Sequence, residues 1–246
     1  MCGRYTQTQS GEAIAAAFHL AHTPDPTPRY NIAPTQPVSA IAQPGTERQY
    51  RIFQWGLIPS WAKDPAIGNR MINARAETAA EKPSFRTAFK RRRCLIVADG
   101  FYEWKKVAPS ATGNITETQG SEETSAKGKA KAKKQPYYIQ MNDPSLFAMA
   151  GLWESWESGD GSYIESCTIL TTEPNGLMQS IHNRMPVILH PADYDLWLDP
   201  KEQNRERLQS LLRPYEDDAM QAYPVSTTVN SPRNKTAACV EPLGKG

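Results

Sequence analysis

The sequence predicts an α+β fold in which short strands outnumber short helices. Its 246 residues, 39% of them hydrophobic, are enough to bury one substantial core. Short apolar or alternating runs recur along the chain, as expected for strands, and the stretches with helical periodicity are brief and bounded by proline or glycine. This length fits one large domain or two small ones, and we expect a single domain over residues 1–246.

The first third of the chain is predicted to be mainly strand. Ser10 is a typical N-cap residue for a short helix over residues 11–20, where apolar side chains recur four positions apart. The proline-rich stretch of residues 22–37 excludes a helix there. Residues 38–42 and 50–54 then have the composition of the two strands of a hairpin.

The middle of the chain contains the run that we expect at the centre of the core. Residues 94–98 are continuously apolar, which is typical of a strand buried on both faces. Asp99 and Gly100 should then turn the chain, and Glu103 follows between two aromatic residues. Aromatic surface desolvates a carboxyl group, which raises its pKa and suits it to general acid or base catalysis. An ordinary ion pair between Glu103 and an arginine or lysine is the alternative.

Ordered elements are predicted to continue into the C-terminal third. Thr172 is a candidate N-cap for a helix with Pro174 in its first turn, and this helix should end near His182. The other predicted strands are residues 137–141, 146–152, 166–170, 186–189 and 220–225, and the other predicted helices are residues 84–90, 191–198 and 201–212.

Two segments are predicted to lie outside this framework. Residues 107–135 are rich in alanine, serine, threonine, glycine, glutamate and lysine, with almost no large apolar side chain, which is typical of a disordered low-complexity insertion. We expect it to be a solvated loop that joins two strands, and a flexible arm that adds affinity for phosphate is the alternative. The C-terminal tail from about residue 239 is predicted to be loose.

Composition argues against several classes of protein. The formal net charge of +2 is too small to indicate nucleic-acid binding by itself. The four cysteines lie far apart without a CxxC pair, and the four histidines lack zinc-ligand spacing, so we expect no metal and no cofactor. The start of the chain has no signal-peptide core, and no apolar stretch is as long as a membrane span. We therefore expect a protein of a reducing intracellular compartment, with free thiols.

Cys2 is the first candidate for chemistry. Its side chain is small and glycine follows, so we expect removal of Met1, which would leave a thiol and an α-amine on neighbouring carbons. Near neutral pH both groups have a nucleophilic fraction, because their reference pKa values are about 8.5 and about 7.7 to 8.0. Such a 1,2-aminothiol attacks an aldehyde twice: the amine forms an imine, and the thiolate then closes a five-membered thiazolidine. A buried cysteine without a chemical role is the alternative.

Polar residues occupy every second position from residue 73 to residue 77. Asn73, Arg75 and Glu77 should therefore lie on one face of an extended segment. An amide, a guanidinium and a carboxylate in a row suit a site that holds a phosphate and orients a sugar oxygen. An edge strand that faces water is the alternative.

Two further residues have candidate roles near DNA or near Cys2. Trp61 lies in an irregular loop just before several basic residues and is a candidate platform for a stacked nucleobase, whereas Trp55 at the start of that loop is expected in the core. His182, at the predicted end of a short helix, is a candidate proton shuttle. A histidine stabilised by the helix dipole is the alternative.

Six short motifs occur in a fixed order along the chain. They are MCGRY at residues 1–5, RYNIAP at 29–34, WGLIPSW at 55–61, INARAET at 72–78, DGFYEW at 99–104 and IHNRMP at 181–186. Together they resemble the SOS response-associated peptidase (SRAP) family. The resemblance spans roughly residues 2–230 and is interrupted mainly by the lysine-rich insertion, which is longer than the family leads us to expect.

The resemblance implies a bent, mostly antiparallel sheet that forms a barrel-like core with flanking short helices. It also implies a basic groove for single-stranded DNA and a pocket for the processed cysteine, which family members attach to the aldehyde of an abasic site through a thiazolidine. Carried over by motif, the catalytic residues are Cys2 as the nucleophile, Asn73 as a partner of the sugar or the α-amine, Glu103 as acid or base, and His182 as the group that assists ring opening and release. The implied DNA-binding residues are Arg4 and Arg75 on phosphates, Trp61 near the lesion, and Thr171 in the pocket lining.

We therefore expect a DNA-damage response protein that shields abasic sites in single-stranded DNA as a covalent adduct. It would be a thiol enzyme, placed by the family name among peptidases and hydrolases and capable of lyase-type chemistry. One alternative is a cysteine peptidase, acting on its own N-terminus or on other chains, with His182 as the base and Asn73 in an oxyanion hole. Another is a non-catalytic reader of modified bases. A covalent shield needs no second subunit, so we expect a monomer in the cytoplasm, at the nucleoid in a bacterium or in the nucleus of a eukaryote.

Overall fold

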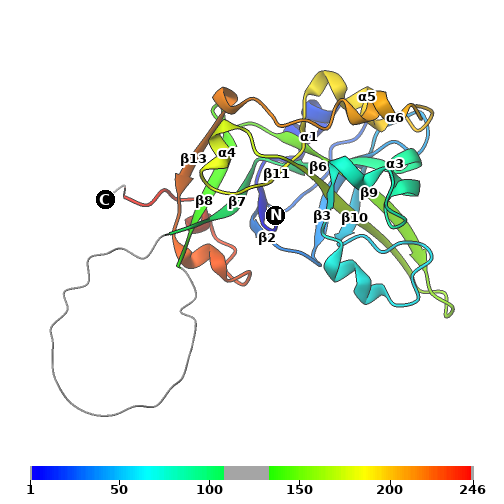
Figure 1. The fold of residues 1–246 in the computed structure, drawn as a ribbon, viewed down its shortest axis with the longest axis horizontal. Coiled ribbons are helices and arrows are strands. Elements are labelled where there is room, and N and C mark those ends of the chain that lie inside the picture. The colour runs from blue at the N-terminus through cyan, green and yellow to red at the C-terminus, as the bar shows by residue number, and fades with distance from the viewer. Residues whose placement is uncertain (1, 108–132, 245–246) are drawn as a thin grey trace, which may run out of the picture.

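A closed five-stranded barrel lies at the centre of the fold (Figure 1). The computed structural model describes residues 2–107 and 133–244. The barrel strands are β3 (Pro37–Ala42), β4 (Gln49–Trp55), β6 (Arg93–Ala98), β9 (Phe147–Glu157) and β10 (Tyr163–Thr172). They pair in the circular order β3–β6–β9–β10–β4, and only the pairing of β4 with β10 is parallel. The predicted mostly antiparallel, barrel-like core is confirmed, as is the predicted hairpin of β3 and β4.

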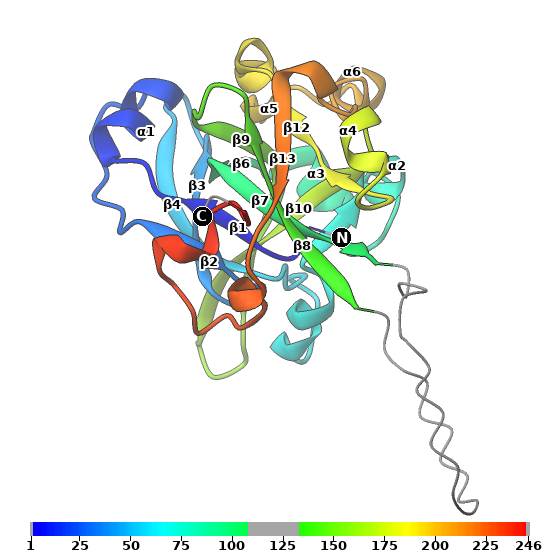
Figure 2. The ribbon, with the colours of Figure 1, turned by 90° about the vertical axis from the view of Figure 1, so that its left-hand side faces the viewer.

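A second sheet packs against the barrel. Its strands, in spatial order, are β13 (Met220–Pro224), β8 (Lys134–Met141), β7 (Gly100–Lys106), β1 (Tyr5–Gln7) and β2 (Arg29–Ile32), all antiparallel to their neighbours. Figure 2 shows β7, β8 and β13 lying across the barrel strands. Phe101 and Ile139 on this sheet share one buried cluster with Ile96 of the barrel, so the two layers enclose a common core.

Alternation along the strands divides the core into layers. In β6, Cys94 and Ile96 belong to the cluster shared with the second sheet, whereas Leu95 and Val97 belong to a cluster covered by helices. The apolar run at residues 94–98 is therefore buried on both faces, as predicted. A third, smaller cluster lies between the second sheet and the C-terminal segment.

The helices are short and lie around the barrel. They are α1 (Gly11–Phe18), α2 (Ala76–Ala79), α3 (Arg86–Arg91), α4 (Gly176–Gln179), α5 (Tyr194–Leu198) and α6 (Arg205–Gln209). The 3-10 helices are η1 (Pro65–Arg70), η2 (Pro191–Asp193), η3 (Asp217–Ala219), η4 (Thr227–Asn230) and η5 (Ala237–Cys239). The remaining short strands are β5 (Asn73–Arg75), β11 (Met185–Pro186) and β12 (Ile188–Leu189). Ser10 caps α1 as predicted. Within the described residues, no helix is long and apolar enough to cross a membrane.

Strand pairing between distant parts of the chain changes the ends of several predicted helices and strands. Thr172 does not cap α4: it is the last residue of β10, where it pairs with Met185, and the side chain of Asn175 caps the helix instead. The single strand predicted at residues 186–189 is divided, because β11 pairs with β10 and β12 pairs with β9. The predicted turn at residues 99–100 is a bend that carries the chain from the barrel into the second sheet.

The two segments predicted to be irregular have different outcomes. Residues 108–132 of the predicted insertion lie outside the described residues, and the strands on either side, β7 and β8, pair antiparallel. The C-terminal segment departs from the expected loose tail. Cys239 is fully buried, Val225 forms a bridge with Pro242, and the Leu243 N–H donates to the Pro224 carbonyl at 2.9 Å.

Arg93 is a buried guanidinium that joins three parts of the fold. Only 3% of the residue is exposed, and the side chain donates to five main-chain carbonyls. The acceptors are Phe89 and Lys90 in α3, Trp197 in α5, and Asp199 and Glu202 beyond it. The charge is thereby compensated by oriented carbonyl dipoles.

Replacing Arg93 should destabilise the fold strongly. We expect Arg93→Met to lower the free energy of unfolding by roughly 3 kcal/mol or more, because buried carbonyls lose their donors. Arg91→Met, at an exposed position on α3, is the control and should change stability by less than about 0.5 kcal/mol. Chemical denaturation measures both, and equal midpoints for the two variants would contradict this assignment.

Candidate active site

Cys2 lies in the cluster enclosed between the barrel and the second sheet. The residue is fully buried and shares this cluster with Trp55 and Cys167 of the barrel. Strand β1 begins three residues later and pairs with both β7 and β2. The start of the described chain is therefore anchored in the interior of the molecule.

Asn73 holds the main chain of Cys2. It lies at the start of β5, which pairs in parallel with β10, and its Nδ2 donates to the Cys2 carbonyl at 2.8 Å. The neighbouring Ile72 carbonyl accepts the indole N–H of Trp55 at 2.8 Å, which fixes this strand against the barrel. The Asn73 Oδ1 is buried, and no described residue donates to it. The amide therefore retains an acceptor beside Cys2.

Glu103 points into the same core from β7. It lies two residues after Phe101, so both side chains lie on the face that packs against the barrel. The residue is 2% exposed, and burial raises the pKa of its carboxyl group to about 7. The predicted desolvation of this carboxyl group is confirmed.

His182 lies just beyond α4, with its Nδ1 3.9 Å from the Glu103 Oε1. The Arg184 N–H donates to the same Nδ1 at 3.1 Å. The neutral tautomer that accepts this bond carries its proton on Nε2, and the Arg184 carbonyl lies 3.2 Å from the same Nδ1. Burial lowers the pKa of His182, which favours this neutral form.

The Cys2 thiol differs from the expectation based on its reference pKa. Burial, followed by the negative charge of Glu103, raises its pKa far above the usual range. Burial therefore disfavours the thiolate that we expected near neutral pH, because sequence reasoning used the reference pKa of a solvated thiol. The structure brings Cys2, Asn73, Glu103 and His182 together, and their individual roles remain predictions.

Two residues predicted to contact DNA have internal partners. Arg4 donates to the Asn31 Oδ1 at 2.9 Å, to the Val229 carbonyl at 2.8 Å and to the Asn230 carbonyl at 3.2 Å. Thr171 is only 2% exposed, and its hydroxyl donates to the Ala74 carbonyl at 3.4 Å. These bonds give Arg4 a structural role at the C-terminal segment, and the contacts of Arg4 and Thr171 with DNA remain predictions.

Arg75 is exposed at the end of β5, but Glu77 does not continue its strand. Helix α2 begins at Ala76, so the predicted alternating face ends after Arg75. Glu77 instead binds Arg184 through two hydrogen bonds of 2.6 and 2.9 Å. Arg184, two residues after His182 within the same sequence motif, was not recognised from the sequence.

The loop from Trp55 to Trp61 separates the two tryptophans as predicted. Trp55 is fully buried, whereas Trp61 is 59% exposed. Trp61 lines a cavity of about 320 Å³ together with Lys63 and Arg70. Gly56 anchors the loop, because its φ is +131° and a Cβ there would lie 2.6 Å from the Gly68 carbonyl oxygen. A base-stacking role for Trp61 remains a prediction.

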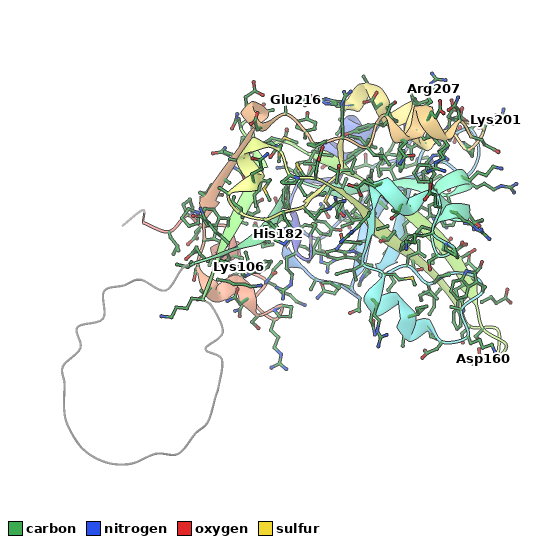
Figure 3. The ribbon with its side chains drawn as sticks, in the orientation of Figure 1. Lys106, Asp160, His182, Lys201, Arg207 and Glu216 are labelled. Carbon is green, nitrogen blue, oxygen red and sulfur yellow. The ribbon has the colours of Figure 1, made fainter. Side chains whose placement is uncertain are left out.

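A basic cavity beside His182 was not recognised from the sequence. It has a volume of about 380 Å³, and its lining residues are Trp104, Lys105, Lys106, Lys134, Gln179, Ser180, Ile181, His182 and Asn183. Figure 3 shows His182 and Lys106 on the same side of the molecule. The lysines come from the ends of β7 and β8, and only pairing of these strands across the insertion brings them to His182. No group of three or more His, Cys, Asp or Glu side chains suited to a metal ion occurs among the described residues.

Comparisons with known proteins identify the family of the chain. The model of the family described as SOS response associated peptidase (SRAP) matches residues 1–232, and the chain belongs to this family. Abasic site processing protein YoqW of Bacillus subtilis is 43% identical over 98% of this chain and 99% of its own length. Abasic site processing protein HMCES of Xenopus tropicalis is 33% identical over 79% of this chain, which spans 58% of that relative. A crystal structure of a protein from Bacteroides thetaiotaomicron superposes with a TM-score of 0.80 at 26% identity, covering 98% of this chain and 100% of that one.

The two predicted phosphate-binding arginines should respond differently to mutation. We expect Arg4→Met to lower the free energy of unfolding by about 2 kcal/mol and to accelerate hydrogen exchange at residues 226–231, because three hydrogen bonds from a charged group are lost. Arg75→Met should leave stability unchanged and weaken binding to single-stranded DNA with a reduced salt dependence. Hydrogen exchange and DNA titrations at two salt concentrations test this contrast, and the opposite pattern would reverse the two assignments.

Proposed function

We propose that this protein recognises abasic sites in single-stranded DNA and shields them through a covalent thiazolidine bond to Cys2 after removal of Met1. The observation that carries the proposal is the convergence on Cys2 of an amide, Asn73, and a proton-transfer pair, Glu103 and His182. The names of the relatives, which describe abasic site processing, support the substrate class.

The reaction consists of two additions at one carbon. The α-amine of Cys2 adds to C1′ of the ring-opened sugar, and loss of one water molecule gives an imine. The thiol sulfur then adds to the same carbon, and its proton passes to the ring nitrogen. The product is the DNA plus the protein minus one water, and the imine is removed before β-elimination can cut the strand.

The acid and base groups suit the opening of the sugar ring. A carboxyl group with a pKa of about 7 is partly ionised at neutral pH, so Glu103 can accept the proton of the C1′ hydroxyl. When protonated, His182 can donate its Nε2 proton to the ring oxygen as the C1′–O4′ bond breaks, which leaves the neutral ring with its Nδ1 beside the Arg184 main chain. The unpaired Asn73 Oδ1 is a buried acceptor beside Cys2, where the freed α-amine would supply a donor.

The basic surface near this cluster suits a DNA backbone. Lys105, Lys106 and Lys134 line the cavity that reaches His182, and exposed Arg75 lies on the strand that carries Asn73. Trp61 offers an exposed ring between basic side chains for a neighbouring base. This distribution of charge explains how a chain with a net charge of only +2 would bind a polyanion.

The covalent step predicts a defined change in mass. Wild-type protein lacking Met1, incubated with an oligonucleotide that carries one abasic site, should gain the oligonucleotide mass minus one water in a bond that survives denaturation. Cys2→Ala should form no adduct, because both the thiol and the thiazolidine are lost. Intact-mass spectrometry measures both proteins.

The same experiment separates the alternatives. Cys2→Ser retains the amine, so it can form only the reversible imine and should give an adduct only after borohydride reduction. A protein that lacks Met1 but forms no adduct would contradict the proposal and favour a peptidase that uses Cys2 on an amide. Retained DNA affinity in Cys2→Ala without any wild-type adduct would favour a reader of modified bases.

Glu103 should set the pH dependence of adduct formation. If its carboxylate is the base, the single-turnover rate of the wild type rises with pH through about 7, as this group ionises. Glu103→Gln should lower the rate about 100-fold or more and remove the inflection near pH 7. Quenched reactions between pH 5.5 and 8.5 measure the profile, and an unchanged inflection in Glu103→Gln would assign it to another group.

A further inference from the structure

Arg184 connects the segment that carries His182 to the segment that carries Asn73 and Arg75. Its guanidinium binds both carboxylate oxygens of Glu77 at 2.6 and 2.9 Å and also donates to the Thr171 carbonyl at 2.5 Å. Glu77 lies in α2, directly after the strand of Asn73 and Arg75, and Thr171 lies in β10. The planar, bidentate geometry restricts both the position and the rotation of the arginine.

The main chain of Arg184 contacts the imidazole of His182. Its N–H lies 3.1 Å and its carbonyl oxygen 3.2 Å from the same Nδ1. The N–H is a fixed donor, so it pairs with Nδ1 when the ring is neutral. The carbonyl becomes the partner when the ring is protonated and Nδ1 carries a hydrogen. One residue therefore offers a matched main-chain group to each protonation state of His182.

We propose that Glu77 and Arg184 are positioning residues for His182. Their ion pair holds the Arg184 main chain against Nδ1, which keeps the proton of neutral His182 on Nε2 and provides an acceptor for the imidazolium. Arg184 binds Glu77, Thr171 and His182, so we assign the pair an effect that acts through the histidine. This role rests on the proposed function for its effect on catalysis, but its effect on the imidazole exists in the protein alone.

The arrangement explains why a partly exposed ion pair would matter. Only 17% of the Arg184 side chain is exposed, whereas 50% of Glu77 is. Such a pair adds little stability by itself. Fixing the tautomer matters more, because only a proton on Nε2 is available for donation away from the Arg184 main chain.

Glu77→Gln and Glu77→Ala test the proposal. Both remove the carboxylate fork from an exposed position on α2, and Glu77→Asp restores the charge on a shorter side chain. Glu81→Gln is the matched control, because Glu81 also pairs with an arginine, Arg205, at 2.5 Å on the surface. All variants are compared after removal of Met1.

The first readout is the nitrogen NMR spectrum of His182 without DNA. Wild type and Glu81→Gln should show the Nε2–H tautomer, whereas Glu77→Ala should show a mixture of tautomers and a changed titration midpoint. The other charged groups that act on this ring are the α-amine at the start of the chain, Glu103 and Lys106 on β7, and Lys134 on β8, and all are the same in the variants that are compared. An unaltered tautomer and midpoint in Glu77→Ala would overturn the proposal.

The second readout is the rate of adduct formation at an abasic site. We expect Glu77→Ala to lower the single-turnover rate about tenfold, with DNA affinity within twofold of wild type and partial recovery in Glu77→Asp. A rate loss explained entirely by weaker or tighter DNA binding would overturn the positioning role. If wild type forms no adduct, the proposed function fails, while the NMR readout still decides the role of the ion pair.

Discussion

The complete burial of Cys2 is the constraint on which the site depends. A thiol removed from water resists ionisation, and the nearby carboxyl group of Glu103 strengthens this resistance. A reactive cysteine usually lies in an electropositive, partly exposed environment, and Cys2 does not. Any reaction at this residue must therefore bring its electrophile into the core and supply a proton acceptor there. The groups around Cys2 match these requirements.

Three distant parts of the chain meet at Cys2 because two sheets share one core. Parallel pairing of β5 with β10 places Asn73 at the Cys2 carbonyl, and the alternation of β7 directs Glu103 inward beside Phe101. The turn after α4 then places His182 at Glu103. Ordering such separated segments costs conformational entropy, and apolar burial offsets this cost, including burial in the cluster that contains Cys2.

Local patterns in the sequence were sufficient to predict features that depend on residues adjacent in the sequence. The apolar run at residues 94–98 predicted a strand buried on both faces, and the aromatic residues beside Glu103 predicted its desolvation. Features that depend on partners elsewhere were missed. Glu77 was assigned to a strand although its partner, Arg184, lies more than a hundred residues away, and the extension of β10 to Thr172 depends on pairing with Met185. Two of the three internal acceptors of Arg4, the Val229 and Asn230 carbonyls, are likewise more than two hundred residues away in η4. Short periodicities contain no information on such contacts.

Burial also determines the order of the proposed steps. A protonated thiol in the core is a poor nucleophile towards a free aldehyde, so the thiol does not react first. Burial raises the pKa of the Cys2 thiol above the reference pKa of an α-amine. The amine therefore loses its proton more readily and would attack C1′ before the sulfur does. Once the imine forms, its carbon is bonded to the nitrogen of Cys2 and lies close to the sulfur of the same residue. Ring closure is then intramolecular. The same burial that suppresses the thiol in the resting protein would then direct it only towards an electrophile already attached to Cys2.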